Sequence, residues 1–332
     1  MNLDRFQANY LSFLKAFQNG YAKSQIAYSY KTNYTPRLCQ LVQQMGGYAE
    51  VVSGMEYDLA LRIGVAAERI IFNGPYKQTV DFERALLNDA IVNLDSHYEV
   101  QLLCALATRF PNKTFRIGMR CNFSIGTEPL SRFGFDVKSK DFQTTLQRLR
   151  ALPNGRIIGL HCHFLAPERS AQAYADIGQR MITLAQTEFA DEPLEFIDLG
   201  GGFFSPMSPD LQKQFPYPIP TFAEYGQAIA HVFKTAFPDE NGPELILEPG
   251  ISLTADTMKF ITKVIDLKTT GERPIALVAG SRYDIKPTLS PRNLPISIAS
   301  APSGQASKHR FDIVGSTCME NDCLHKAYQG EL

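Results

Sequence analysis

The stretch Gln25-Ile26-Ala27-Tyr28-Ser29-Tyr30-Lys31 decides the fold, because the pattern it opens recurs along the chain. It is apolar and rich in aromatic residues, which is typical of a buried strand, and a polar turn with Pro36 follows it. Lys31 therefore stands at the end of a buried strand. Burial lowers the pKa of a lysine, and a neutral amine is what Schiff-base chemistry with an aldehyde requires. The simpler alternative is a lysine that reaches solvent from the strand end.

Seven further strand candidates follow the first, and helical patterns separate them. The strand candidates are 25–30, 48–52, 69–72, 90–94, 114–121, 156–163, 194–199 and 244–248. The helical stretches lie near 36–45, 54–63, 78–87, 97–109, 141–151, 170–187 and 221–236. Strands that alternate with helices in this way over about 230 residues predict a (β/α)8 barrel. An open, doubly wound sheet is the alternative, because alternation alone does not prove that the sheet closes.

Two further regions complete the predicted organisation. Over residues 3–18, apolar residues recur at intervals of three and four, which predicts an amphipathic helix ahead of the barrel. We therefore expect a barrel domain with a leading helix over 1–250. Beyond it no clear helix is visible, and a second, all-β domain is expected over 251–332. Its β-prone segments are 252–267, 274–280, 293–299 and 310–315.

The overall composition excludes several classes of protein. The 332 residues are 44% hydrophobic and 20% charged, which is typical of globular proteins. The net charge of −1 offers no field that would attract nucleic acid or an anionic membrane surface. No apolar run is long enough to span a membrane, and the first residues do not resemble a signal peptide. The scattered cysteines form no CxxC pair, so we expect a reducing, cytoplasmic location.

Two strand candidates end in residues suited to binding charged groups. In (β/α)8 barrels the functional residues lie at the C-terminal ends of strands, and phosphate is commonly held after the last two. The seventh candidate ends in Asp198-Leu199-Gly200-Gly201-Gly202-Phe203, where glycines let backbone N–H groups approach an anion, or simply form a turn. The eighth ends in Glu248-Pro249-Gly250, where a buried carboxylate needs a cationic or protonated partner. A protonated pyridine nitrogen would serve, and a nearby lysine or arginine is the alternative.

The sixth candidate ends in His161-Cys162-His163. Alternation along a strand points both histidines to the barrel interior. No third ligand at zinc spacing is visible, so no metal is predicted. An imidazole that covers an aromatic cofactor is the favoured interpretation, with a hydrogen-bonded core residue as the alternative for His161. Near the chain end, Cys318-Met319-Glu320-Asn321-Asp322 puts a thiol and a carboxylate on one loop, a pattern that by itself is typical of solvated loops.

In their order along the chain, these motifs resemble those of the fold-type III pyridoxal-phosphate (PLP) decarboxylases, the ornithine/diaminopimelate decarboxylase family. The resemblance spans nearly the whole chain and implies a PLP-dependent amino-acid decarboxylase. The matching segments are Tyr28 to Asn33, Glu50 to Ser53 with Glu56, His161 to His163, Gly200 to Phe203, Glu248 to Gly250, and Gly315 to Asp322.

The resemblance implies a role for each matched residue of the barrel. Lys31 would form the Schiff base with PLP, and Glu50 would lie near its amine. His163 would stack on the pyridine ring. Glu248 would keep the pyridine nitrogen protonated, which favours decarboxylation because a protonated ring absorbs electrons more readily. Racemases of the alanine type place an arginine there. The phosphate would be surrounded by Gly200, Gly201, Gly202 and Gly250.

The C-terminal motif implies a homodimer with shared active sites. In the family, Cys318 and Asp322 enter the active site of the other subunit. Cys318 would assist protonation at Cα, and Asp322 would meet the distal group of the substrate. Met319 stands where diaminopimelate decarboxylases have a glutamate. This difference favours a specialised amino acid or amino-acid conjugate, as in siderophore or other secondary pathways.

Some features depart from the family pattern. Leu165-Ala166 replaces a Gly-Ser that helps to hold phosphate, and Ile251 replaces an arginine, so Arg169 or Ser170 would have to substitute. The family usually has an opening strand before residue 1 and further strands beyond Leu332. We therefore expect a fragment, a natural shortening, or completion by a partner. A racemase and a catalytically silent PLP-binding homologue stay open as alternative functions.

Overall fold

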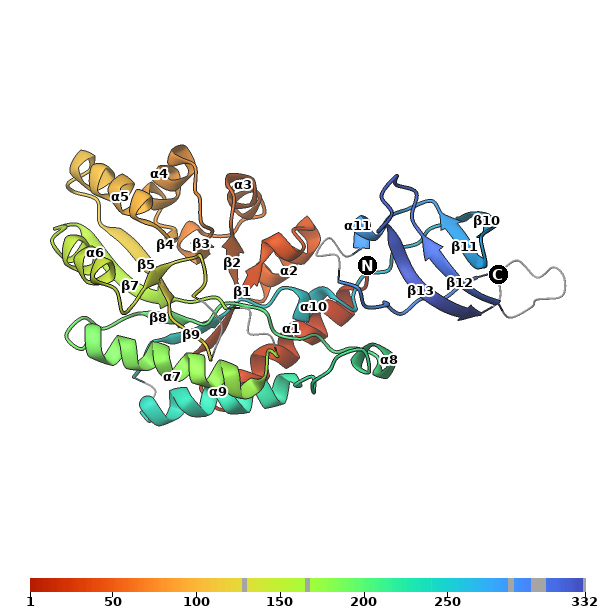
Figure 1. Cartoon of the computed structure of the whole chain (residues 1–332). Helices are drawn as coiled ribbons and strands as arrows, with labels where there is room; N and C mark the ends of the chain where they lie inside the picture. Colours follow the sequence, from red (N-terminus) through yellow and green to blue (C-terminus); the bar gives the residue numbers. More distant parts are fainter. Residues whose placement is uncertain (127–129, 165–167, 240, 286–289, 300–308, 331–332) are drawn as a thin grey trace. The chain divides into compact units, whose positions relative to one another are not determined.

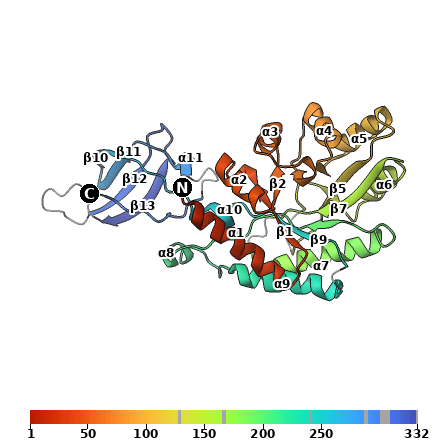
Figure 2. The same ribbon diagram turned by 180° about the vertical axis from the view of Figure 1, so that it is seen from behind.

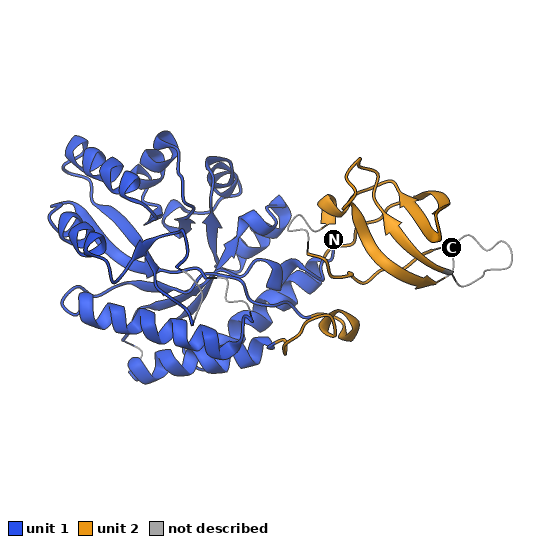
Figure 3. Ribbon diagram, in the orientation of Figure 1, with its two compact units in different colours: residues 1–206, 220–257 blue, residues 207–219, 258–332 orange. Residues whose placement is uncertain are grey.

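The computed structural model describes residues 1–126, 130–164, 168–239, 241–285, 290–299 and 309–330. The chain forms two compact units, one of residues 1–206 and 220–257 and the other of residues 207–219 and 258–332 (Figure 3). Among the described residues, no helix has the length and apolar character needed to cross a membrane.

Parallel strands form a closed barrel in the first unit (Figures 1 and 2). In the described part of the chain, eight strands pair in sequence order, and the last pairs with the first. They are β1 Ser24–Ser29, β2 Tyr48–Val51, β3 Ile70–Phe72, β4 Ile91–Leu94, β5 Phe115–Asn122, β7 Gly155–His161, β8 Phe196–Asp198 and β9 Glu244–Leu247. The two-residue strand β6, Phe135–Asp136, adds to β5. The predicted (β/α)8 barrel is confirmed, and the open sheet is excluded because the ring closes.

Helices surround the barrel and start at local sequence signals. The main ones are α1 Leu3–Gln18, α2 Pro36–Gln44, α3 Gly54–Arg62, α4 Thr79–Leu87, α5 His97–Arg109, α6 Lys140–Arg150, α7 Ala171–Glu188 and α9 Phe222–Ala236. Asn2 accepts a hydrogen bond from the backbone of α1, and Thr221 forms a reciprocal capping box with Glu224 at the start of α9. The helix predicted over 3–18 is α1, which packs against α9.

The barrel interior has an apolar layer and a polar layer. The apolar layer consists of Ala27, Ile71, Ile91, Ile158, Phe196 and Ile246. Near the C-terminal ends of the same strands the side chains become polar, and none is more than 9% exposed. We call these residues the polar layer: Ser29, Glu50, Asn73, Asn93, Arg120, His161, Asp198 and Glu248. The apolar layer seals the barrel, and the polar layer lies where active sites of this fold are built.

The second unit contains a four-stranded sheet in the order β10-β11-β12-β13. The strands are β10 Val264–Thr270, β11 Arg273–Val278, β12 His309–Val314 and β13 Cys323–Gly330. Their buried core is formed by Ala276, Val278, Phe311, Ile313 and Leu324. The segments predicted near 274–280 and 310–315 correspond to β11 and β12, whereas β13 was not predicted.

Some predictions for the C-terminal region are wrong. Residues 252–254 lie in the short helix α10, Ile251–Thr254, and a second short helix, α11, spans Arg282–Ile285. Asn9 of α1 donates to the backbone carbonyl of Leu253, which holds α10 against α1 within the first unit. The described residues 293–299 form no strand. There the Asn293 N–H donates to the side chain of Gln214, so this backbone group is satisfied without a ladder.

Candidate active site

Lys31 lies in the short 3-10 helix η1, Tyr30–Thr32, directly after β1. Its Nζ is 2.5 Å from Oε2 of Glu50, and its side chain is 39% exposed whereas that of Glu50 is fully buried. Burial alone would lower the pKa of Lys31, but the carboxylates of Glu50 and Glu248 raise it above the ordinary value. The expected lowering of the Lys31 pKa is therefore wrong for this structure, because the neighbouring negative charge outweighs desolvation.

A single amide connects the two carboxylates nearest Lys31. The Nδ2 group of Asn73 donates to Oε1 of Glu50 at 3.0 Å and to Oε1 of Glu248 at 2.5 Å. Ser29 donates its hydroxyl to Oε2 of Glu50 at 2.7 Å. Lys31, Glu50 and Glu248 thus lie together at one end of the barrel. The contacts that hold them come from β1, from β2 and from the ends of β3 and β9.

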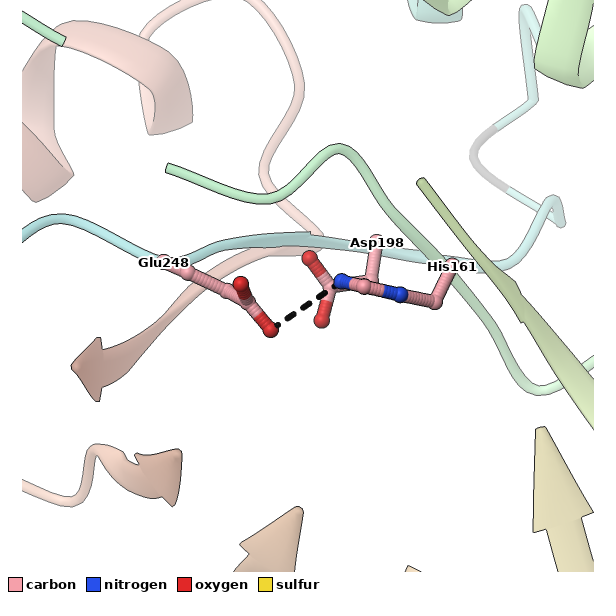
Figure 4. Close-up of side chains that lie close together, drawn as sticks. All are labelled: His161, Asp198 and Glu248. Atoms are coloured by element: carbon pink, nitrogen blue, oxygen red, sulfur yellow. Dashed lines mark ion pairs between the residues drawn. The ribbon is translucent and has the colours of Figure 1, made fainter. Parts of the chain in front are cut away.

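Glu248 shares its buried surroundings with His161 and Asp198 (Figure 4). Nε2 of His161 is 3.4 Å from Oε1 of Glu248, and burial lowers the pKa of this imidazole. Burial together with the charge of Glu248 raises the pKa of Asp198 well above its usual range. Burial alone would also raise the pKa of Glu248, but His161 and Lys31 hold it well below the usual range. The two pKa shifts have opposite directions, so the negative charge of this carboxyl pair is favoured at Glu248 over Asp198.

The same three side chains bear on the metal prediction. The sequence showed no third ligand at zinc spacing, yet Asp198 and Glu248 lie beside His161, with ligand atoms within 4.8 Å of one another. Sequence spacing could not reveal this group, because the three residues come from separate strands, and the expectation of no metal stays a prediction. Because burial and the charge of Glu248 raise the pKa of Asp198, the negative charge of this group is favoured at Glu248. The arrangement is better suited to holding a charged carboxylate at Glu248.

The glycine turn after β8 shapes the site by close backbone approach. The first and third glycines, Gly200 and Gly202, have φ of +69° and +96°, which favours glycine. A Cβ at Gly201 would lie 2.3 Å from the backbone oxygen of Glu248. The Gly201 N–H donates to Nδ1 of His163 at 3.2 Å. The turn therefore positions the half-buried His163 ring as well as the end of β9.

Gly250 joins the turn after β9 to the segment that carries Lys31. A Cβ at this position would lie 2.1 Å from Oγ1 of Thr32, the residue after Lys31. Ile251 next to it starts α10 and is 50% exposed. Ser170 caps α7 by accepting from the backbone of Ala173. Arg169 has φ of +46°, and its guanidinium lies over the ring of Phe204. Leu165 and Ala166 lie outside the described residues.

Cys318 and Asp322 belong to the second unit. Cys318 is exposed, and the loop that carries it is held by Asp322, which is only 3% exposed. Oδ1 of Asp322 accepts from Ser281 and from the Arg282 N–H, and Oδ2 accepts from the hydroxyl and N–H of Thr317. Burial would raise the pKa of Asp322, but these donors lower it. Its carboxylate thus fixes the loop around Cys318.

Sequence reasoning missed several residues of the polar layer. Asn73 and Asn93 were not singled out, and Asp198 was noted only as the end of a strand. A signal was present, because Asn73 and Asn93 each stand two positions after an isoleucine of the apolar layer. Period-two alternation would have placed them on the inner face. Their partners could not be found this way, since the contacts cross the barrel between distant strands.

Comparison with known proteins agrees with this geometry. Residues 3–255 match the family described as "Pyridoxal-dependent decarboxylase, pyridoxal binding domain". The "Probable diaminopimelate decarboxylase, chloroplastic" of Oryza sativa subsp. japonica is 28% identical, over 92% of this chain and 62% of its own length. The diaminopimelate decarboxylase of Aquifex aeolicus is 26% identical, over 93% of this chain and 73% of its own length. The chain thus spans between three fifths and three quarters of these relatives.

Solved structures show the same fold. The diaminopimelate decarboxylase of Helicobacter pylori complexed with L-lysine has a TM-score of 0.83 and 22% identity, over 99% of this chain and 82% of that one. Lysine decarboxylase from Selenomonas ruminantium has a TM-score of 0.77 and 21% identity, over 100% of this chain and 82% of that one. The family match covers most of the chain, including every site residue described in the barrel. The chain therefore belongs to the pyridoxal-dependent decarboxylase family.

Proposed function

We propose that this protein catalyses PLP-dependent decarboxylation of an amino acid. The observation that carries the proposal is the convergence of an amine and a buried carboxylate at one end of a closed barrel. Lys31 supplies the amine and Glu248 the carboxylate, and Glu50 with Asn73 connects them by hydrogen bonds. A structural ion pair would need only Lys31 and Glu50, so the second carboxylate calls for a further protonated partner.

The residues present fit pyridoxal phosphate. Among the described atoms, both ring nitrogens of His161 and one oxygen of Asp198 are buried and have no hydrogen-bond partner. The polar layer therefore has polar atoms left for a ligand to satisfy. The partly exposed Lys31 amine is reachable from outside the barrel, whereas Glu248 is only 2% exposed. When bound, pyridoxal phosphate supplies an aldehyde for an amine and a protonated ring nitrogen that withdraws electrons.

Each residue of the site has a proposed task. Glu50, 2.5 Å from Lys31 Nζ, takes up the proton that the amine must lose before it can bond to a carbonyl carbon. Glu248, whose pKa His161 and Lys31 hold well below its usual range, would keep the pyridine nitrogen of the cofactor protonated. His163, oriented by the Gly201 N–H, would cover one face of the cofactor ring. The phosphate is assigned to the backbone around Gly200, Gly201, Gly202 and Gly250.

The choice of decarboxylation over racemisation depends on Glu248. A carboxylate beside the pyridine nitrogen deepens the electron sink that loss of carbon dioxide from Cα requires. Asn73, which donates to Glu248, is a neutral amide, and burial lowers the pKa of the neighbouring His161 imidazole. This setting supports decarboxylation more than the shallow sink that suits a racemase.

We propose that the second unit supplies the substrate end of the site through a homodimer. Cys318 would act near Cα of the substrate bound by the other subunit, on a loop fixed by Asp322. Asp322 is then placed to influence the distal part of the substrate through this loop. Met319, 54% exposed on the same loop, offers no charge to a distal amine. A specialised amino acid or amino-acid conjugate is the proposed substrate class.

The direct test is release of carbon dioxide from a panel of amino acids. The panel contains meso-diaminopimelate, lysine, ornithine, arginine and N-acylated or carboxylated derivatives of the diamino acids, each incubated with the PLP-loaded protein. The proposal expects release from at least one amino acid, with little or none from meso-diaminopimelate. Racemisation of the same amino acids without carbon dioxide would overturn it, as would cofactor binding with no turnover of any panel member.

A further inference from the structure

We infer that Asn73 is a positioning residue that sets the distance and charge balance between Glu50 and Glu248. This assignment deepens the proposed function and rests on it. The residue lies directly after β3, is 4% exposed, and contacts both carboxylates with one Nδ2 group. Each hydrogen of the amide therefore meets a different carboxylate, and the two carboxylates are held at opposite sides of one small donor.

The neighbouring Asn93 determines which end of the Asn73 amide faces the carboxylates. An amide can present either its oxygen or its nitrogen, and the partners decide which. Nδ2 of Asn93 donates to Oδ1 of Asn73 at 2.8 Å, so this oxygen is already used as an acceptor. The Nδ2 group of Asn73 is consequently turned toward Glu50 and Glu248.

Space for this arrangement comes from β5. A Cβ at Gly118 would lie 1.8 Å from Oδ1 of Asn93, so only glycine at this position admits the Asn93 amide in its observed place. The connection thus runs from Gly118 of β5 through Asn93 of β4 and Asn73 to the carboxylates beside Lys31. It follows the neighbouring strands β5, β4 and β3 and then reaches Glu50 of β2 and Glu248 after β9, with each amide donating toward the carboxylates.

A donor at this position has a clear electrostatic purpose. Glu50 and Glu248 both lie near Lys31, and the single positive charge of Lys31 interacts with both carboxylates. Two buried carboxylates around one ammonium repel each other unless neutral donors share the negative charge. Charge-assisted hydrogen bonds from an amide are suited to this, because they stabilise the ionised carboxylate without adding a titrating group. The amide therefore lets Glu248 stay charged while Glu50 accepts the lysine proton.

Replacing Asn73 with aspartate tests the inference, because the side chain keeps its shape and loses both donor hydrogens. Binding of PLP to the apo protein is followed by the visible absorbance band of the Lys31-bound cofactor, from pH 5.5 to 8.5. We expect Asn73→Asp to bind PLP about tenfold to a hundredfold more weakly at the alkaline end. Affinity should recover toward acid pH, where the new carboxyl gains a proton and can donate again. Asn73→Ala should be weakened at every pH without that recovery.

Two controls separate this role from a loss of folding. Asn88→Asp adds the same charge at the exposed end of α4 and should leave PLP binding unchanged. Circular dichroism and thermal unfolding of the apo variants report whether each one folds. Should Asn73→Asp fail to fold, Asn93→Ala provides the second variant, since it removes only the group that orients Asn73, and it should also weaken PLP binding.

The outcomes distinguish this inference from the proposed function. A wild-type protein that never develops the band would refute the proposed function itself. A wild-type protein that binds PLP while folded Asn73→Asp binds equally well at all pH values would overturn the role of Asn73 alone. A pH-independent loss, equal in Asn73→Asp and Asn73→Ala, would also overturn it, because a donor role predicts that the aspartate variant recovers toward acid pH and the alanine variant does not.

Discussion

Breaking the buried ion pair between Lys77 and Glu99 should destabilise the barrel strongly. Both side chains are fully buried, and Nζ of Lys77 donates to Glu99 at 2.9 Å and to the backbone carbonyls of Gly74 and Asn93 at 3.0 and 2.9 Å. The pair thus holds the segment after β3 and the strand β4 that carry Asn73 and Asn93. Lys77→Met removes the cation beside the Glu99 carboxylate, which keeps only the Asp95 N–H, and the lysine donor of two carbonyls.

The expected loss is about 3–5 kcal/mol in the free energy of unfolding, the range for removing one partner of a buried pair. Burial already raises the pKa of Glu99, and loss of the lysine raises it further. A group whose pKa is raised in the folded state contributes stability that is present below its unfolded pKa and lost as the pH rises. The destabilisation caused by Lys77→Met should therefore be larger at pH 8 than at pH 5.

Urea unfolding of the apo protein at both pH values measures this effect. Arg109→Met is the matched control, because Arg109 pairs with Glu83 through two hydrogen bonds but is 54% exposed, and loss of this exposed pair should cost far less than loss of the buried one. The double variant Lys77→Met/Glu99→Gln should recover at least about 2 kcal/mol, since no unpaired buried charge remains. Equal costs for Lys77→Met and Arg109→Met would refute the reasoning.

Two further substitutions test the polar layer and the glycine turn. Burial raises the pKa of Asp198, so the stability that this carboxyl contributes is lost as the pH rises above its pKa in the unfolded chain. In urea unfolding, the stability of Asp198→Asn relative to wild type should therefore increase from pH 5 to pH 7.5. A relative stability that falls with pH would contradict the raised pKa of Asp198. Gly201→Ala places a Cβ 2.3 Å from the backbone oxygen of Glu248 and should lower the free energy of unfolding by about 1–3 kcal/mol, measured by thermal unfolding. Gly178→Ala in α7 is the control, because its Cβ would make contacts of 3.5 Å, and it should be neutral or stabilising. Equal effects of the two substitutions would contradict the close backbone approach at Gly201.

Local patterns predicted most of the barrel. The strand candidates and helical stretches correspond to β1–β5, β7–β9 and the helices around them within a few residues, because alternation and apolar spacing are local properties. The grouping of residues 207–219 with the second unit had no sequence signal that we recognised. It depends on contacts such as Gln214 with Asn293, which join segments far apart in the chain.

The site, like the fold, has a part that the sequence predicted and a part that required the three-dimensional structure. Lys31, Glu50, His163 and Glu248 lie at or near the C-terminal ends of strands, so motif order predicted them as one group, and the structure brings them together. The direction of the Lys31 pKa could not be predicted from burial alone, because the nearby carboxylates come from β2 and from the end of β9. The amide connection through Asn73 also required the closed barrel, since it joins residues that lie 175 positions apart.

The most direct test of the account is the absorbance of the protein mixed with pyridoxal phosphate, compared between wild type and Lys31→Ala. The account predicts a visible band for wild type that disappears on reduction of the covalent linkage with borohydride. Lys31→Ala, folded by circular dichroism, should show only the spectrum of free cofactor. Lys77→Arg is the control for loss of a different lysine, because Lys77 is buried beside Glu99 and arginine keeps its positive charge. This variant should retain the band if it folds. A colourless wild-type protein, or an unchanged band in Lys31→Ala, would contradict the central claim that Lys31 holds the cofactor.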